Sequence, residues 1–373
     1  MSEVITNLLD QVFDGSVREM LRWQNLPDHL HAIIELDCDQ RGLTIARAFS
    51  RPDLIVSPDG PRVLEVNFGS SNGGLAFVDT IQARFEQILG KLAADCGIRL
   101  NPARSMASVG RTLAKLLRCA VADTDRNHIA VAVTTVAEAK TPKGHLVDFC
   151  KGLEALGYRV TLALFSDIEA SHGRVQVGGE DVNAIYCMCT FAEMLRANVP
   201  MQLLRDLIRA DRDGTADFIG APGHVVFDSK ANLALVHDPV ADKGIDADRL
   251  AWARRVIAPT WKTTARPDRA GACIYKPLND FGGNGISFTP PAEPSGQSNY
   301  IAQEIVENAC LWFDGDGELT RHTCFGPSVT GGEVASIVLR ALVPNGHAPI
   351  INARQGAAVG PALANAWASS HAA

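Results

Sequence analysis

Apolar and polar residues recur with a helical period in the first fifty positions, most clearly at 17–23, where VREMLRW places its apolar side chains on one face. The pattern then changes to two short apolar runs within 53–67, separated by Ser-Pro-Asp-Gly, which predicts a β-hairpin. A glycine-rich segment at 68–74 follows the hairpin. The amphipathic stretch at 78–95 predicts one long helix.

The middle of the chain alternates short apolar runs with longer helical patterns. This order predicts a parallel sheet with helices on its faces, because parallel strands need a crossover between them. The predicted strands are 128–133, 158–164 and 182–186, and the predicted helices are 143–156 and 191–210. We place this lobe at 105–225.

The last third mixes helix and strand. Three further strands are predicted at 272–277, 300–306 and 334–340, the first of which ends at a glycine-rich loop. A Pro/Gly/Ser-rich segment at 290–297 is typical of a surface loop. A chain of 373 residues is long enough for two or three lobes. We therefore expect an α/β protein with α+β lobes.

The composition excludes several classes of protein. The formal net charge is −7, whereas a nucleic-acid binder needs a basic face to neutralise phosphates. Nine cysteines are scattered without any C-x-x-C pair, which indicates reduced, buried thiols and no zinc cluster. The sequence contains no basic leader and no long apolar run, so we expect a cytoplasmic protein without membrane partners.

The predicted hairpin carries two candidate motifs. Glu65 and Asn67 stand two apart on one strand, so their side chains share a face and offer two hard oxygens of the kind that Mg²⁺ prefers. On the other strand, Arg51 can reach a γ-phosphate or a developing acyl phosphate. Each motif alone also fits an ordinary strand with polar residues facing solvent. The combination of R-x-D, an Asp-Gly turn and L-E-V-N is harder to explain by chance.

A lysine and a glycine-rich loop follow the strand at 272–277, in the run K-P-L-N-D-F-G-G-N-G. Lys276 offers a point charge for phosphate oxygens, and the small residues let backbone N–H groups approach a phosphate. Asp280 can hold a second Mg²⁺. The lysine precedes the glycines, so the run is not a Walker A loop, and a simple flexible turn remains the alternative. The nucleotide-contacting candidates in the loop are Gly282, Gly283 and Asn284.

Two further segments can contact ligands. The strand segment Gln303, Glu304 and Ile305 can bind adenine through its backbone, although a half-buried strand is equally consistent with the pattern. Arg354, in a Gly/Ala-rich run, can close over a phosphate or bind a substrate carboxylate, or it can belong to a plain loop. Lys230 opens a predicted helix, where a lysine is ordinarily solvated.

Together these residues resemble the ATP-grasp superfamily, with the hairpin motifs placed before the lysine loop as in a circular permutation. The order is similar to eukaryotic-type glutathione synthetase and glutathionylspermidine synthetase. The metal strand and following stretch of the former group, E-I-N, a Ser-containing segment and G-G-L, are matched by the run from Glu65 to Leu75. Its K-P-x-x-E-G-G-G-N loop is matched from Lys276, with Asp280 at the position of the metal-binding glutamate.

The resemblance implies ATP and Mg²⁺ as cofactors. It implies that Lys230 and Lys276 hold phosphates, and that Arg51 stabilises the transferring phosphoryl group. The implied metal ligands are Glu65, Asn67 and Asp280, and the candidate substrate contacts are Ser70, Ser71, Asn72 and Arg354. The implied domains are an N-terminal part of the ATP-grasp lobe at 1–104, the parallel lobe at 105–225, and the ATP-binding remainder at 226–373.

The chain also departs from the family. Glutathione synthetases carry an arginine for the γ-glutamyl substrate after the strand that corresponds to 184–186, whereas Cys187, Met188 and Cys189 stand here. The resemblance therefore does not carry γ-glutamylcysteine over as the substrate. It implies an ATP-dependent carboxylate-amine ligase that forms amide bonds in peptide-type biosynthesis, acts on small molecules and assembles as a homodimer. A small-molecule kinase and a non-catalytic ATP-binding protein are the alternatives.

Overall fold

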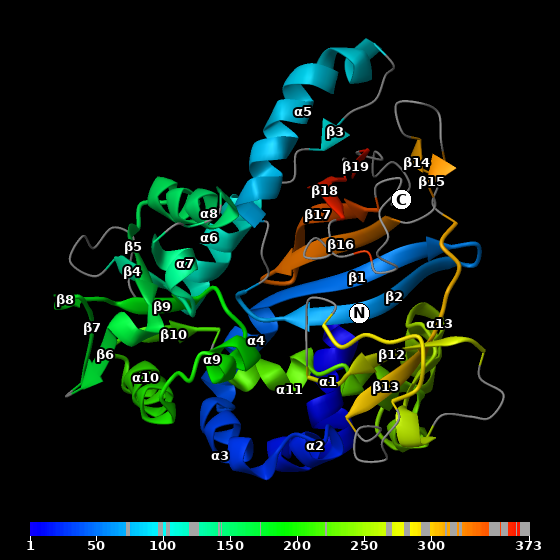
Figure 1. Ribbon diagram of the computed structural model, residues 1–373, viewed down its shortest axis with the longest axis horizontal. Helices are drawn as coiled ribbons and strands as arrows, with labels where there is room; N and C mark the ends of the chain where they lie inside the picture. Colours follow the sequence, from blue (N-terminus) through cyan, green and yellow to red (C-terminus); the bar gives the residue numbers. More distant parts are fainter. Residues whose placement is uncertain are drawn as a thin grey trace.

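The computed structural model describes most of the chain in three connected regions (Figure 1). The described residues are 1–71, 75–95, 100–101, 105–118, 127–140, 142, 144–171, 173–220, 222–265, 271–279, 284–291, 299–309, 312–313, 319–320, 323–342, 351, 357–362 and 364–365. The regions are an antiparallel sheet in the centre, a parallel sheet on one side, and a small antiparallel sheet with the N-terminal helices below it. The expected α/β class is confirmed.

Four helices occupy the first 48 residues, as the helical period predicted. Local capping explains two of their starts: Ser16 accepts a hydrogen bond from the Glu19 N–H, and Asp39 accepts one from the Gly42 N–H. Their apolar faces join the largest core cluster. The helices are α1 (Ser2–Phe13), α2 (Val17–Trp23), α3 (Asp28–Asp37) and α4 (Gln40–Ala48).

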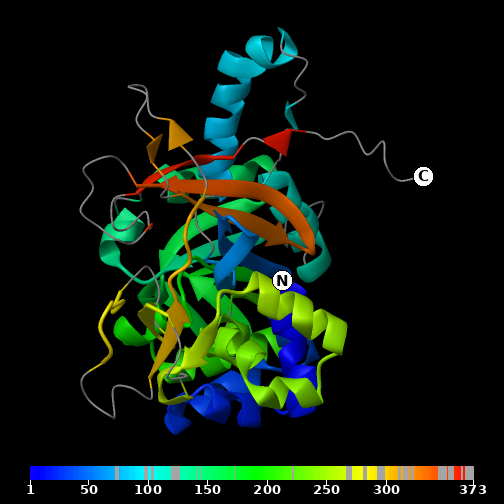
Figure 2. The same ribbon diagram turned by 90° about the vertical axis from the view of Figure 1, so that its right-hand side faces the viewer.

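The predicted hairpin is confirmed as β1 (Phe49–Ser57) and β2 (Gly60–Phe68). It belongs to a five-stranded antiparallel sheet of order β18-β17-β16-β1-β2, whose other strands come from the end of the chain. Strand β1 pairs with β16, so Ser50 lies opposite Val329. The other strands are β16 (Thr323–Thr330), β17 (Glu333–Ala341) and β18 (Ala358–Pro361). Helices α5 (Leu75–Asp95) and α6 (Ser105–Leu116) contact this sheet, and α5 extends away from the body (Figures 1 and 2).

The predicted parallel sheet is confirmed, with strand order β10-β9-β4-β5 and parallel pairing throughout. All six residues of β4 are buried, as expected for a central parallel strand. The strands are β4 (His128–Val133), β5 (Arg159–Leu164), β9 (Ala184–Cys187) and β10 (Asp217–Ile219). The helices of this lobe are α7 (Val136–Lys140), α8 (Gly144–Ala155), α9 (Phe191–Arg196) and α10 (Met201–Asp213).

The prediction of one helix over 191–210 was wrong. Helix α9 ends at Arg196, and Asn198 takes a left-handed backbone with φ 54°. Pro200 then occupies the N-cap position of α10. One helix cannot continue through this residue, because proline has no backbone N–H to donate. The apolar period runs through both segments, which is why the break was missed.

The lower region contains the three-stranded sheet β11-β13-β12, in which β13 is central. Its strands are β11 (Thr260–Lys262), β12 (Cys273–Pro277) and β13 (Tyr300–Glu304), which confirm the strands predicted at 272–277 and 300–306. Helix α12 (Ala231–His237) packs against β11, whereas α11 (Val225–Asp228) and α13 (Ala247–Val256) contact β2 of the central sheet. The remaining short elements are β3 (Leu100–Asn101), β6 (Ile168–Ser171), β7 (Arg174–Val177), β8 (Glu180–Asp181), β14 (Trp312–Phe313), β15 (Leu319–Thr320), β19 (Ala364–Asn365) and the 3₁₀ turns at 165–167, 222–224, 239–243 and 263–265.

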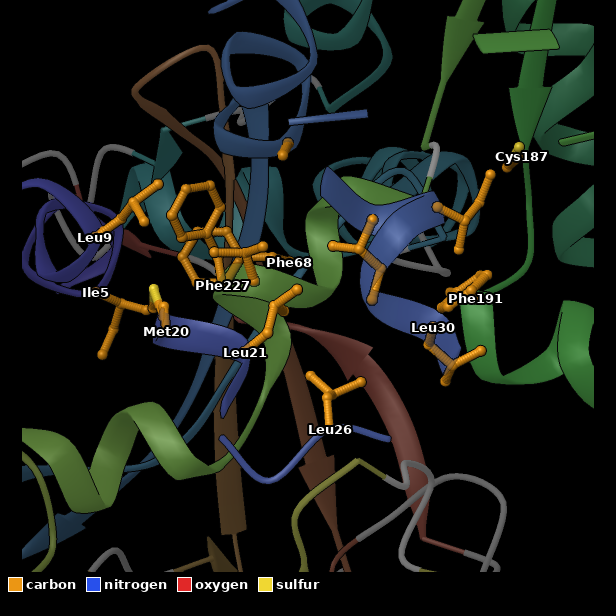
Figure 3. Close-up of a cluster of buried hydrophobic side chains, with 14 of the residues drawn as sticks. Ile5, Leu9, Met20, Leu21, Leu26, Leu30, Phe68, Cys187, Phe191 and Phe227 are labelled. Carbon is orange, nitrogen blue, oxygen red and sulfur yellow. The ribbon is translucent and has the colours of Figure 1, made fainter. Parts of the chain in front are cut away.

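One apolar cluster joins the N-terminal helices, the hairpin and one face of the parallel sheet (Figure 3). Phe68 at the end of β2 lies against Phe227 of α11, with ring centroids 5.7 Å apart. Ion pairs reinforce the junction, because Arg41 of α4 contacts both Asp211 and Asp217 of the parallel lobe. Within the described ranges, no helix has the length and apolar content needed to cross a membrane.

Candidate active site

The hairpin register brings its four polar side chains onto one face. Asp53 pairs with Glu65 and Arg51 pairs with Asn67, and residues directly opposite in a ladder point to the same side of a sheet. This arrangement agrees with the alternation expected from the sequence. The face is turned toward α12 and β12, where the two candidate lysines lie.

Lys230 reaches the hairpin from the start of α12. Its Nζ lies 2.9 Å from Glu65 Oε1, and its side chain is buried. The backbone fixes this position, since the Lys230 N–H donates to the Leu278 carbonyl just beyond β12. The lysine that ordinary helix patterns would leave in solvent is therefore directed at the hairpin carboxylate.

Lys276 reaches the same strand from β12. Its Nζ donates to the Leu64 carbonyl at 3.0 Å and to Gln303 Oε1 at 2.7 Å. Gln303 is held in turn by a hydrogen bond from its Nε2 to Thr260 Oγ1 at 2.9 Å. Burial lowers the pKa of Lys276, and the charge of Lys230 adds to that effect while Glu65 opposes it. Two lysines from separate elements thus contact adjacent positions of β2: Lys230 contacts the Glu65 carboxylate, and Lys276 contacts the carbonyl of Leu64.

Asp53, on the same face of the hairpin as Glu65, contacts two arginines. Arg51 Nε donates to Asp53 Oδ1 at 3.1 Å, and Arg340 Nη2 lies 2.5 Å from the same oxygen. Burial acts to raise the pKa of Asp53, but the two guanidinium groups outweigh it and hold that pKa below its usual range. Gly326 makes room for Arg51 and Asp53, because a Cβ there would stand 3.0 Å from Arg51 Cδ and 3.1 Å from Asp53 Oδ1.

Arg340 was missed by the sequence reasoning. It lies on β17 opposite Cys324 and is buried, although it carries a charge. The signal was present as a single arginine in the otherwise apolar run IVLRAL. A buried charge needs a partner, and this one required a partner from the other end of the chain.

Among the residues that the structure describes, none donates a hydrogen bond to the side-chain oxygen of Asn67. Both of its hydrogen bonds to the rest of the hairpin use Nδ2, which donates to the Arg51 carbonyl at 3.2 Å and to Asp53 Oδ2 at 3.3 Å. These bonds orient Oδ1 away from the partners of Nδ2, on the face that carries Glu65. The oxygen pair fits a magnesium ion by ligand type. Among the described residues, no three His, Cys, Asp or Glu side chains gather as a metal cluster, and Asp280 lies outside them.

The other predicted contacts divide into three sets. Ser70 is buried and its hydroxyl donates to the Cys187 carbonyl at 2.7 Å, so it joins β2 to the end of β9. Ser71 and Asn284 are described and at least partly exposed. The predictions for Gly282, Gly283, Asn72 and Arg354 lie outside the described residues.

The predicted adenine segment has part of its backbone in use. The Glu304 N–H donates to the Pro259 carbonyl, and the Ile305 N–H donates to the Ala272 carbonyl. Ile305 is 52% exposed, whereas Gln303 is buried against Lys276. Any contact with a base would then use carbonyl groups and side chains, and adenine binding stays a prediction.

Comparisons with known proteins give a likeness of fold. No protein-family model matches the sequence, and no curated protein matches it. The structure is similar to that of a glutathione synthetase-like effector, GSS30, from Globodera pallida in its apoform, with a TM-score of 0.50 and 11% identity. The similarity covers 89% of this chain and 83% of that one. The chain therefore has a glutathione synthetase-like fold.

Proposed function

We propose that this protein is an ATP-dependent carboxylate-amine ligase of the ATP-grasp type. The observation that carries the proposal is that two buried lysines contact one strand of the hairpin, Lys230 at the Glu65 carboxylate and Lys276 at the Leu64 carbonyl. The same hairpin presents Asn67 and Arg51. Buried lysines that approach one another cost free energy, and binding a polyanion between them repays it. The glutathione synthetase-like fold supports the same class of chemistry.

The reaction would proceed in two steps. A carboxylate oxygen of the substrate attacks the γ-phosphorus of ATP, and the bond to the ADP oxygen breaks. An amine nitrogen then attacks the acyl carbon, phosphate leaves with the C–O bond electrons, and the nitrogen loses a proton. The protein mainly positions the reactants and neutralises charge, so no side-chain nucleophile is required.

The residues of the site have different roles in this proposal. Lys230 and Lys276 hold phosphate oxygens, and Arg51 faces the transferring group, with Arg340 holding its partner Asp53 in place. Glu65 and Asn67, joined by Asp280, would hold Mg²⁺, which neutralises phosphate charge when bound. The proposed nucleotide contacts are Gly282, Gly283, Asn284, Gln303, Glu304 and Ile305, and the proposed substrate contacts are Ser70, Ser71, Asn72 and Arg354.

A trapping assay tests this proposal. The protein is incubated with Mg-ATP, pools of small carboxylic acids and amino acids, and hydroxylamine as a generic amine. Hydroxamate formed in equal amount with ADP is the expected result, because hydroxylamine intercepts an acyl phosphate. ADP with a stable phosphorylated compound and no hydroxamate would indicate a kinase instead. ATP binding without ADP would indicate a protein that only binds the nucleotide.

A further inference from the structure

A cavity of about 360 Å³ lies beside the lysine pair, between the α2–α3 turn, α9, α11 and the end of β12. Its apolar wall includes Leu26, Leu30 and Phe191, and Leu30 lies beside Phe191 in Figure 3. Asn25 and Asn299 also line it, and their carboxamides are joined by a hydrogen bond of 2.7 Å. The volume suits a small organic ligand.

The cavity is adjacent to the phosphate-facing groups. Ser229 and Pro277 line it, and each is the direct chain neighbour of one of the two lysines. Asp228 also lines it, while its Oδ1 accepts a hydrogen bond of 2.7 Å from the N–H of Phe68, the residue after Asn67. One carboxylate thus contacts both the cavity and the strand that carries Glu65 and Asn67.

The cavity is distinct from the segment expected to contact adenine. Strand β13 runs from Tyr300, opposite Pro277, to Glu304, opposite Cys273. Only the Pro277 end borders the cavity, and the two ends are about 13 Å apart at 3.3 Å per residue. A ligand in the cavity would therefore lie at the Tyr300 end of β13, whereas adenine is expected at the Glu304 end.

The charges of the lining select one type of ligand. Among the described residues that line the cavity, none is lysine or arginine, and the ionisable ones are Asp228 and His224. A ligand with its own carboxylate or phosphate would be placed beside Asp228, with His224 but no lysine or arginine among the described lining residues to offset the repulsion. An ammonium group would instead have a carboxylate as its partner, and the apolar wall would cover a hydrocarbon body.

We propose that this cavity binds the amine co-substrate, and that this co-substrate is a primary amine on a small alkyl or aryl body without a carboxylate of its own. The inference rests on the proposed ligase function for the role of the amine. The placement of the cavity beside the lysine pair would bring the amine nitrogen to the acyl group formed there.

Calorimetric titration without nucleotide tests the binding separately from the chemistry. The probes are isoamylamine, its carboxylic analogue isovaleric acid, and glycine, each titrated into the full chain. We expect saturable binding of isoamylamine, with an affinity at least about tenfold above those of the acid and of glycine.

Three variants locate the ligand. Ala192 lines the cavity and is half-buried, so Ala192→Phe should fill part of it and weaken isoamylamine binding by about tenfold or more. Ala197→Phe is the matched control, because Ala197 is exposed at the end of the same helix and does not line the cavity. Asp228→Asn keeps an oxygen that can accept from the Phe68 N–H but removes the charge, and should also weaken binding by about tenfold.

The outcomes separate this inference from the function on which it rests. Absence of isoamylamine binding, equal binding of glycine, or unchanged binding by Ala192→Phe overturns the cavity assignment, even when the trapping assay yields hydroxamate. Binding that follows the expected pattern supports the assignment. A trapping assay without hydroxamate overturns the ligase reaction and the co-substrate role together, whatever the calorimetry gives.

Discussion

Lys276 carries an ammonium group that is almost closed off from water. Its two acceptors, the Leu64 carbonyl and Gln303, compensate part of the lost hydration, and burial still lowers its pKa. A lysine held in this way is already oriented, so little conformational entropy is lost when it binds a phosphate.

Replacing Lys276 by methionine keeps an unbranched side chain only one atom shorter and removes the charge. We expect the rate of ADP formation in the trapping assay to fall about 100-fold or more, with circular dichroism unchanged. Lys262→Met is the matched control, because Lys262 lies on β11 of the same sheet, on the far side of β13, with its Nζ 3.8 Å from the centroid of the Trp23 ring. Equal ADP formation by the wild type and by Lys276→Met would remove Lys276 from the phosphate site.

Asp53 neutralises two guanidinium groups, so its own charge stabilises the fold. Asp53→Asn leaves the buried Arg340 without its anion, and we expect the free energy of unfolding in urea to fall by about 2–4 kcal/mol. Asp59→Asn should change it little, since Asp59 is an exposed partner of Arg62 at 3.7 Å. A similar loss of unfolding free energy in both variants would show that the buried ion pair stabilises the fold no more than the exposed one.

The same carboxylate predicts a dependence on pH. The pKa of Asp53 in the folded protein lies below its value in the unfolded chain, which is about 3.9. Its contribution is therefore complete above that value and is lost as the pH falls through the lower, folded pKa. The difference in unfolding free energy between wild type and Asp53→Asn should stay constant from neutral pH to about 4, and shrink only below it. A difference that declines already near pH 6 would contradict this assignment.

Local sequence patterns predict some residues of the candidate site but not others. Arg51, Glu65 and Asn67 could be predicted as one polar face, because strand alternation and a hairpin turn are local properties. Arg340 could not, because its partner Asp53 is brought to it only by pairing between strands far apart in the chain. Local patterns contain no information on such pairings.

At the scale of elements, α9 and α10 show how a continuous period of apolar residues can conceal a break between two helices. Asn198 adopts φ 54°, a conformation that asparagine and glycine tolerate better than other residues. We expect Asn198→Ala to lower the free energy of unfolding by about 1 kcal/mol, and Asn198→Gly to leave it nearly unchanged. Thermal unfolding followed by circular dichroism measures both. Equal effects of alanine and glycine would show that backbone strain is not the cause.

The predicted start of the first strand was also wrong, because local patterns do not show which strands will pair. The first predicted apolar run begins at residue 53, yet β1 begins at Phe49. Phe49 and Ser50 become part of the strand because they pair with Thr330 and Val329 of β16. A neighbouring strand can extend a ladder beyond the residues whose own pattern favours it.

At the scale of the whole molecule, the central sheet joins both ends of the chain. Strands β1 and β16 share one ladder, so their amides should exchange hydrogen for deuterium in the same cooperative opening. The distal half of α5, where Ile88 and Leu92 are exposed, should exchange much faster. Mass spectrometry of peptic fragments measures this. Early exchange of β1 with continued protection of β16 would show that the hairpin opens independently.

The pairing of β1 with β16 also sets a delay during synthesis. The hairpin leaves the ribosome early, but the edge of β1 receives its partner only after β16, at 323–330, has been made. At about 5–20 residues per second, that interval is on the order of ten seconds or more. During it the nascent chain carries an unpaired strand edge, a surface that can associate with other chains. Maturation of this protein therefore depends on what protects that edge until β16 has been made.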